Sequence, residues 1–201
     1  MRSLLRMAAL ELFRERGYDG TTAAEIAARI GVTERTFFRH FPDKREVLFA
    51  GETEFHAALG AAIAAAPDGL SPLQVLLWAF KSIQQMFLDN RAFAEPAQEI
   101  IARTPALRER QLGKTASTIA LMAAALERRC VEPNLATLAA GAGMAIFGHA
   151  AQAWTKDPAV DLGVHLERAL QSLQGLSGGG GAQSHQASGE DRRRMDLDEL
   201  L

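Results

Sequence analysis

Cysteine is almost absent from this chain, and its scarcity excludes proteins stabilised by disulfides or by cysteine-bound zinc. Cys130 is the only cysteine among 201 residues, so neither a disulfide framework nor a cysteine-based zinc site can form. The five histidines are dispersed, without the paired spacing of a zinc-binding motif. We therefore expect no metal site, and the composition favours the reducing cytoplasm as the compartment.

Long apolar runs are missing as well. The nearest approach to one, Leu138 to Trp154, is short, rich in alanine and glycine, and interrupted by His149 and Gln152. A membrane span needs about 20 predominantly apolar residues. The stretch therefore predicts a buried packing helix and no membrane partner, and the charged residues near the N-terminus do not fit a signal peptide.

Recognisable catalytic motifs are also lacking. The sequence has no P-loop, no G-x-S-x-G turn and no glycine-rich dinucleotide turn. We therefore expect no catalytic residue and no cofactor. An enzyme stays open as a rival interpretation, because the dispersed histidines can still converge in space.

Charge is unevenly distributed along the chain. Residues 1–50 carry nine Lys and Arg against seven Asp and Glu, whereas residues 51–201 carry thirteen against seventeen. The net charges are therefore +2 and −4. A basic head on an acidic body is compatible with DNA binding through the N-terminal part.

The stretch from Thr21 to Lys44 predicts two short helices joined by a tight turn. Thr22 is a good N-cap, and Glu25 three residues later completes a capping box. Gly31 ends the first helix, because a left-handed backbone is cheap only without a Cβ. Thr33 caps a second helix, which Pro42 ends. Two helices with a glycine-containing turn indicate a helix-turn-helix unit.

The second helix of this unit has an inner and an outer side. Phe37 and Phe41 lie one turn apart and are expected to be buried. The outer side presents side chains that donate to base edges or phosphates: Arg35, Thr36, Arg39 and His40. DNA binding is therefore the leading hypothesis, although capped helix pairs also occur in helical adaptors that never meet DNA.

Two runs resemble the DNA-binding domain of TetR-family transcriptional regulators. They are G-V-T-E-R-T-F-F-R-H-F-P-D-K-R-E-V-L from Gly31 to Leu48, and A-A-L-E-L-F-R-E-R-G-Y-D-G-T-T from Ala8 to Thr22. The resemblance implies a ligand-responsive homodimer, by family default a repressor, that binds a palindromic operator. Phe38 stands where the family usually has Tyr, so a hydroxyl contact to phosphate is lost. The residues expected to contact DNA are Thr22, Thr33, Arg35, Thr36, Phe38, Arg39, His40 and Lys44.

The rest of the chain predicts an all-α protein of about nine helices. Asp43 is expected to start a long helix, with Glu46 in its capping box, that runs from the head into the body as far as Pro67. Further helices are expected at residues 73–88, 93–103, 106–129, 134–156 and 161–175. We predict a DNA-binding domain at 1–48, a ligand-binding and dimerisation domain at 49–176, and a flexible tail at 177–201.

Small residues fill the helix expected at 134–156. Gly143 and Gly148 lie within a glycine- and alanine-rich surface from Ala139 to Ala153, which lets another helix approach closely. The TetR resemblance implies that the last two long helices pair with those of a second copy. We therefore expect the homodimer to form there.

The segment from Glu99 to Leu112 resembles the effector domain of TetR members grouped with the mycofactocin regulator. The apolar body fits an apolar or amphipathic small molecule, and the resemblance implies an acyl-CoA-like one whose acidic group would meet arginines. Alternatively, the aromatic side chains fill the core and the arginines face solvent. The candidate ligand-binding residues are Trp78, Met86, Phe87, Arg103, Arg108 and Met122.

Overall fold

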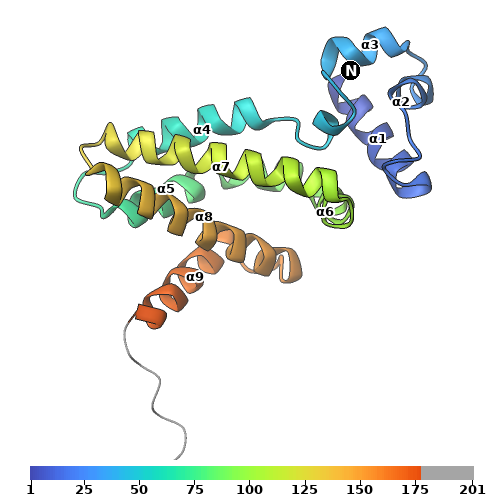
Figure 1. Cartoon of the computed structure of the whole chain (residues 1–201). Coiled ribbons are helices and arrows are strands. Elements are labelled where there is room, and N and C mark those ends of the chain that lie inside the picture. The colour runs from blue at the N-terminus through green and yellow to red at the C-terminus, as the bar shows by residue number, and fades with distance from the viewer. Residues whose placement is uncertain (178–201) are drawn as a thin grey trace, which may run out of the picture.

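The computed structural model describes residues 1–177, and within this range all regular structure is helical (Figure 1). The elements are α1 (Arg2–Arg16), α2 (Ala23–Arg29), α3 (Glu34–His40), the 3₁₀ turn η1 (Arg45–Val47), α4 (Glu52–Ala65), α5 (Pro72–Ser82), α6 (Gln84–Arg103), α7 (Pro105–Glu127), α8 (Pro133–Lys156) and α9 (Leu162–Ser177). The predicted all-α fold is confirmed for these residues. The tail prediction falls almost wholly on residues 178–201, outside the described range.

A small head and an elongated body make up the molecule (Figure 1). Helices α1–α3 form the head, and α4 leads from it into the body. There α4 packs against α5 and α7, while α8 packs against α5, α7 and α9. Helix α7 runs from the head-proximal end of the body to its far end, so it lies against both regions.

Two buried clusters hold the fold together. One fills the body between α4, α5, α7, α8 and α9. The other fills the head, and it also takes in Phe93, Ala97 and Ile101 of α6 and Leu107 of α7. Three short helices bury little apolar surface alone, and the hairpin of α6 and α7 completes their core. The division at residue 48 stays a prediction.

The expected long helix from Asp43 to Pro67 is wrong. Asp43 Oδ1 accepts the backbone N–H groups of Arg45 (2.7 Å) and Glu46 (3.1 Å), but only the short turn η1 follows. The chain then passes through Gly51 at φ 98° before α4 begins. That left-handed conformation costs glycine little and interrupts the helix. Residues 48–51, which we call the linker, therefore separate the head from α4.

The boundary between α5 and α6 also differs from the prediction. The break falls at Ile83, where no glycine or proline marks it, and α6 then continues without interruption through Pro96. Proline removes one helical hydrogen bond. The helix is maintained here because Phe93 and Ala97, on either side of Pro96, are buried in the head core. By contrast, α7, α8 and α9 begin and end within two residues of their expected positions.

The glycines of α8 have different surroundings. A Cβ built on Gly143 would lie 2.6 Å from Cδ1 of Leu76, so Gly143 allows α5 to approach α8 within one chain. Assigning Gly143 to a dimer surface is therefore wrong. A Cβ on Gly148 would meet nothing within 4 Å. Across residues 1–177, no helix is both long enough and apolar enough to cross a bilayer.

Candidate functional site

The helix-turn-helix unit forms as the sequence predicts. Thr22 accepts the backbone N–H of Glu25, and the Glu25 carboxylate accepts the N–H of Thr22 at 2.8 Å, which completes the capping box. Gly31 turns the chain at φ 72°, and Thr33 accepts the backbone N–H of Thr36. These contacts satisfy the free N–H groups of two helices of seven residues, which are marginal alone.

Aromatic anchors fix the orientation of α3. Phe37 and Phe41 are fully buried, with ring centroids 5.6 Å apart, and the half-exposed Phe38 ring packs edge-on against Phe37 at 5.4 Å. Burying two phenylalanines of one seven-residue helix leaves little freedom for it to rotate. The opposite side of α3 is therefore held toward solvent.

The outward side of α3 carries unpaired cations. Arg35 and Arg39 are exposed, and within residues 1–177 neither makes a hydrogen bond or ion pair. Thr36 is half-buried, and its hydroxyl lies 3.1 Å from that of Thr33. His40 is half-buried, with its Nε2 buried and without a partner in the described protein. Two unpaired guanidinium groups on one side of a helix have the donor chemistry that base edges and phosphates accept, and their contact to DNA stays a prediction.

Lys44 lies differently from the arginines. Its Nζ donates to the carbonyl oxygens of Tyr18 (2.8 Å) and Thr21 (2.9 Å) and sits 4.2 Å from the centroid of the Tyr18 ring. Burial, with Asp43 nearby, raises the pKa of Tyr18 to about 12. Lys44 thus fixes the loop between α1 and α2 against η1. Its contact to DNA, like those of the other seven residues, stays a prediction.

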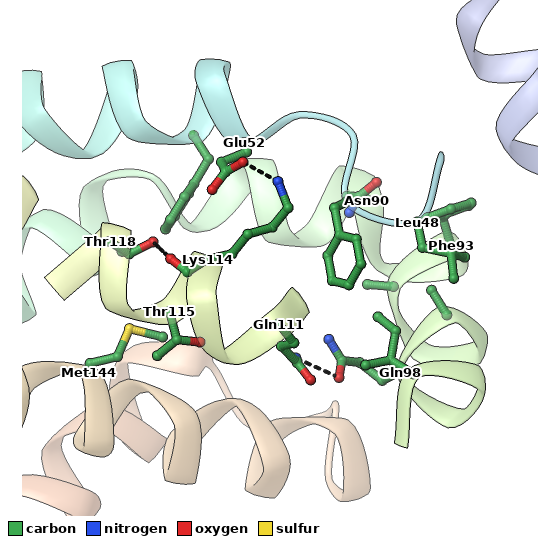
Figure 2. A pocket seen from close by; sticks show the side chains of 15 residues that line it. Leu48, Glu52, Asn90, Phe93, Gln98, Gln111, Lys114, Thr115, Thr118 and Met144 are labelled. Carbon is green, nitrogen blue, oxygen red and sulfur yellow. Dashed lines mark hydrogen bonds and ion pairs between the residues drawn. The ribbon is translucent and has the colours of Figure 1, made fainter. Parts of the chain in front are cut away.

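A cavity of about 260 Å³ lies where the head meets the body (Figure 2). It opens between the linker, α4, α6 and α7, and Met144 of α8 closes one side. Apolar and neutral polar side chains dominate its wall, and the charged groups are Glu52 and Lys114. The lining residues are Leu48, Phe49, Glu52, Phe55, Asn90, Phe93, Ala94, Ala97, Gln98, Ile101, Gln111, Lys114, Thr115, Thr118 and Met144.

Ion pairs join α7 to both ends of the linker. Lys114 Nζ lies 3.1 Å from Oε2 of Glu46 in η1 and donates to Glu52 at the start of α4 (Figure 2). Arg110 Nε donates to Oε1 of Glu46 at 2.8 Å. Burial opposes ionisation of Glu46, but the hydrogen bonds from Arg110 and Lys114 outweigh it and hold the pKa of this carboxyl below its usual range. The cluster thus ties the linker to α7.

None of the six candidate ligand-binding residues lines this cavity. Met122 is fully buried in the body core, and Trp78, Met86 and Phe87 pack against that core. Arg103 and Arg108 are exposed near the turn between α6 and α7. The alternative interpretation, aromatic side chains in the core and arginines in solvent, describes these positions. The sequence did not predict the contact between Lys114 and Glu52, because two residues 62 positions apart give no local sequence signal.

Comparison with known proteins identifies the family. Residues 5–50 match the model for bacterial regulatory proteins of the tetR family, and residues 70–176 match the MftR C-terminal domain. The chain belongs to the TetR family of transcriptional regulators. Both resemblances noted in the sequence are thereby confirmed, and the rival interpretation of a helical enzyme is excluded.

Relatives and solved structures support this membership. TcmR of Streptomyces glaucescens, an HTH-type transcriptional regulator, is 36% identical over 105 residues, which cover 49% of this chain and 46% of TcmR. The match therefore spans about half the length of that curated relative. FadR of Thermus thermophilus, a TetR-family repressor in complex with lauroyl-CoA, is 25% identical, with 94% of this chain and all of that one covered and a TM-score of 0.56.

NalD of Pseudomonas aeruginosa, the secondary repressor of a multidrug efflux pump, shares the fold. Its TM-score is 0.58, its identity 21%, and the alignment covers 86% of this chain and 94% of NalD. At this identity the likeness concerns the fold alone.

Proposed function

We propose that this TetR-family protein is a homodimeric, ligand-responsive repressor in the cytoplasm that binds a palindromic operator through α3. The observation that carries the proposal is the outward side of α3, where Arg35 and Arg39 are exposed and unpaired on a helix held by buried aromatic rings. Guanidinium groups donate in pairs to guanine edges or to phosphates. Within residues 1–177 these two arginines make no hydrogen bond or ion pair that would compete with DNA.

A second copy is expected to pack on α8. Five of its exposed residues are spaced by three, seven, four and three positions, which places them on one face: Leu135, Leu138, Ala145, His149 and Gln152. Leu138 is 71% exposed and Leu135 48%, and leucines of a monomer are seldom left so open on one helix face. We propose that α8, with α9 beside it, forms the dimer interface. A dimer sets two recognition helices about 34–36 Å apart, one turn of DNA.

The cavity below the linker is the proposed effector site, and it replaces the six residues expected from the sequence. Usual ligand pockets span about 300–1,000 Å³, so a cavity of about 260 Å³ suits a compact molecule. FadR is described in complex with lauroyl-CoA, but a cavity of this size would hold only part of an acyl-CoA-like effector. A ligand that favours a state with displaced heads lowers operator affinity in proportion to its preference for that state.

Selection of bound sequences from random DNA tests the proposal. We expect an inverted repeat whose half-sites lie one helical turn apart, bound by two copies of the chain in analytical ultracentrifugation. Arg35→Ala and Arg39→Ala should weaken that binding. Enrichment of no sequence at all, with a folded protein at physiological salt, contradicts DNA recognition by this helix.

A further inference from the structure

Lys114 is shared between two carboxylates that lie on opposite sides of the linker. Glu46 precedes the linker and Glu52 follows it, and both reach Lys114 on α7. The Lys114 side chain is 14% exposed, against 17% for Glu46 and 30% for Glu52. Lys114 also lines the cavity, whereas Glu46 does not. Lys114, the one cation among the described residues that line the cavity, is therefore also a group that ties the linker to α7.

Positive charge exceeds negative charge around this cavity. Arg6 of α1 stacks its guanidinium 3.9 Å from the centroid of the Phe93 ring, and its Nη2 donates to Asn90 Oδ1 at 2.9 Å. Both partners line the cavity. Within the described chain Arg6 makes no ion pair, although the charges of Arg2 and Glu54 act on it with opposite signs, and its buried Nε lacks any hydrogen bond. Burial, followed by the charge of Arg2, lowers the pKa of Arg6.

The balance of these groups favours an anion. Arg6, Arg110 and Lys114 bring three positive charges, and Glu46 and Glu52 bring two negative ones. One further carboxylate would neutralise the cluster. A cation would add to an existing surplus in a partly buried site, where like charges are screened less than at the surface.

Aromatic rings supply the apolar part of the wall. Phe49 comes from the linker, Phe55 from α4 and Phe93 from α6. The Phe49 ring centroid lies 5.5 Å from Lys114 Nζ, so an apolar surface and a cation meet at one end of the cavity. A flat aromatic body beside Phe49 would place a carboxylate within reach of Lys114.

We propose, on the basis of the function proposed above, that the effector is a compact aromatic carboxylate whose carboxylate takes Lys114 from Glu52 and Glu46. The exchange replaces the two carboxylate partners of Lys114 by the carboxylate of the ligand, so the lysine is never left unpaired. Glu52 is released into solvent in the first turn of α4, where the helix dipole favours a negative charge. Glu46 keeps Arg110.

The linker then loses both of its contacts to Lys114, and of these ion pairs only Arg110–Glu46 still holds η1 to α7. An amine that bound to Glu52 would leave Lys114 on Glu46, so Lys114 and Arg110 together would still hold η1 to α7. A carboxylate competes for both contacts of Lys114 at once. The sign of the ligand charge therefore decides how far occupancy of the cavity loosens the head.

Three probes with the same ring system test the charge preference: 2-naphthoate, 2-acetylnaphthalene and 2-(aminomethyl)naphthalene. Binding to the full-length protein is measured by isothermal titration calorimetry without DNA, so the result does not depend on operator recognition. We expect 2-naphthoate to bind about tenfold or more tightly than the neutral ketone, as a charge-assisted hydrogen bond allows. The amine is expected to be the weakest of the three.

Variants distinguish a site that recognises a carboxylate through Lys114 from one that binds any apolar molecule. Lys114→Gln should remove the preference for 2-naphthoate, and Glu52→Gln should strengthen its binding because the competing carboxylate is gone. The matched controls are Lys81→Gln and Glu167→Gln, the two partners of an ion pair that joins α5 to α9. Both controls should bind 2-naphthoate as the wild type does.

Hydrogen exchange reports the release of the linker. In the wild type, the amides of residues 48–51 should exchange faster with 2-naphthoate bound than without it. In Lys114→Gln, 2-naphthoate should leave their exchange rates unchanged. Equal binding of the three probes, binding of none at millimolar concentration, or tighter binding of the amine overturns the proposal. So does weaker binding of 2-naphthoate to Glu52→Gln. A DNA selection that fails while these results hold would refute only the operator function.

Discussion

Replacing Lys44 tests whether its main role is structural or DNA-binding. The Nζ atom makes two charge-assisted hydrogen bonds, at 2.8 and 2.9 Å, and lies over the Tyr18 ring. Hydrogen bonds to charged groups contribute about 1.5–3 kcal/mol each. Solvent recovers part of that here, because Lys44 is half-buried. We expect Lys44→Met, which keeps the aliphatic stem, to lower the free energy of unfolding by about 2–3 kcal/mol.

Urea unfolding followed by circular dichroism measures this loss, and a fall in Tm of about 5–10 °C should accompany it. The neighbouring Arg45→Met is the control, since Arg45 is exposed and, among residues 1–177, forms an ion pair only with Asp43, two residues away. Its stability should stay close to wild type. If Lys44→Met unfolds like the wild type yet loses operator affinity, the inward contacts are unimportant and Lys44 acts on phosphate.

Three further outcomes follow from the contacts of the body. The pKa of Glu46 is lowered, so its ion pairs stabilise the fold above the pKa of the unfolded carboxyl, about 4.3, and this stability is lost as pH falls through the folded pKa. The difference in unfolding free energy between wild type and Glu46→Gln should therefore shrink below about pH 5. A constant difference down to pH 3 would contradict the pairing. Ala145→Glu should dissociate the dimer, as measured by light scattering, while the chain stays folded. Gly143→Glu should instead unfold the body. An Ala145→Glu variant that is folded and dimeric would place the interface elsewhere. Phe87→Ala should lower the free energy of unfolding by about 2–3 kcal/mol, because Phe87 packs on the body core. Loss of the effector response without loss of stability would instead indicate that Phe87 binds the ligand.

The head could be predicted from the sequence because its determinants are local. Thr22 and Glu25 are three residues apart, and the left-handed Gly31 and the cap Thr33 lie next to the helices that they delimit. Each of these residues acts on backbone groups within one turn. Short-range interactions of this kind can be predicted from a single sequence.

The cavity and its ion pairs could not be predicted in this way. Glu46 fits a capping box three residues after Asp43, yet its carboxylate pairs with Arg110, 64 residues away. The capping pattern and the ion pair use the same residue type, so the sequence does not distinguish them. Gly51 alone signalled the interruption before α4, and the break at Ile83 carries no glycine or proline at all.

The candidate ligand residues do not line the cavity, for a related reason. A helix that is apolar nearly all round indicates burial but does not tell a core from a cavity wall. Met122 and Phe87 lie in or against the core, whereas the cavity opens where side chains from the linker, α4, α6 and α7 fail to fill the space between them. Such a void depends on packing among distant segments.

The affinity of Arg39→Ala for the selected operator tests the central claim most directly. Arg39 is exposed and has no partner within residues 1–177, so its removal should leave the unfolding free energy unchanged. Operator binding, measured by fluorescence anisotropy at fixed salt, should weaken by about 1–3 kcal/mol, or roughly 5- to 150-fold. Arg128→Ala, at the far end of α7, should bind as the wild type does. Equal affinity of Arg39→Ala and wild type would contradict DNA recognition by α3.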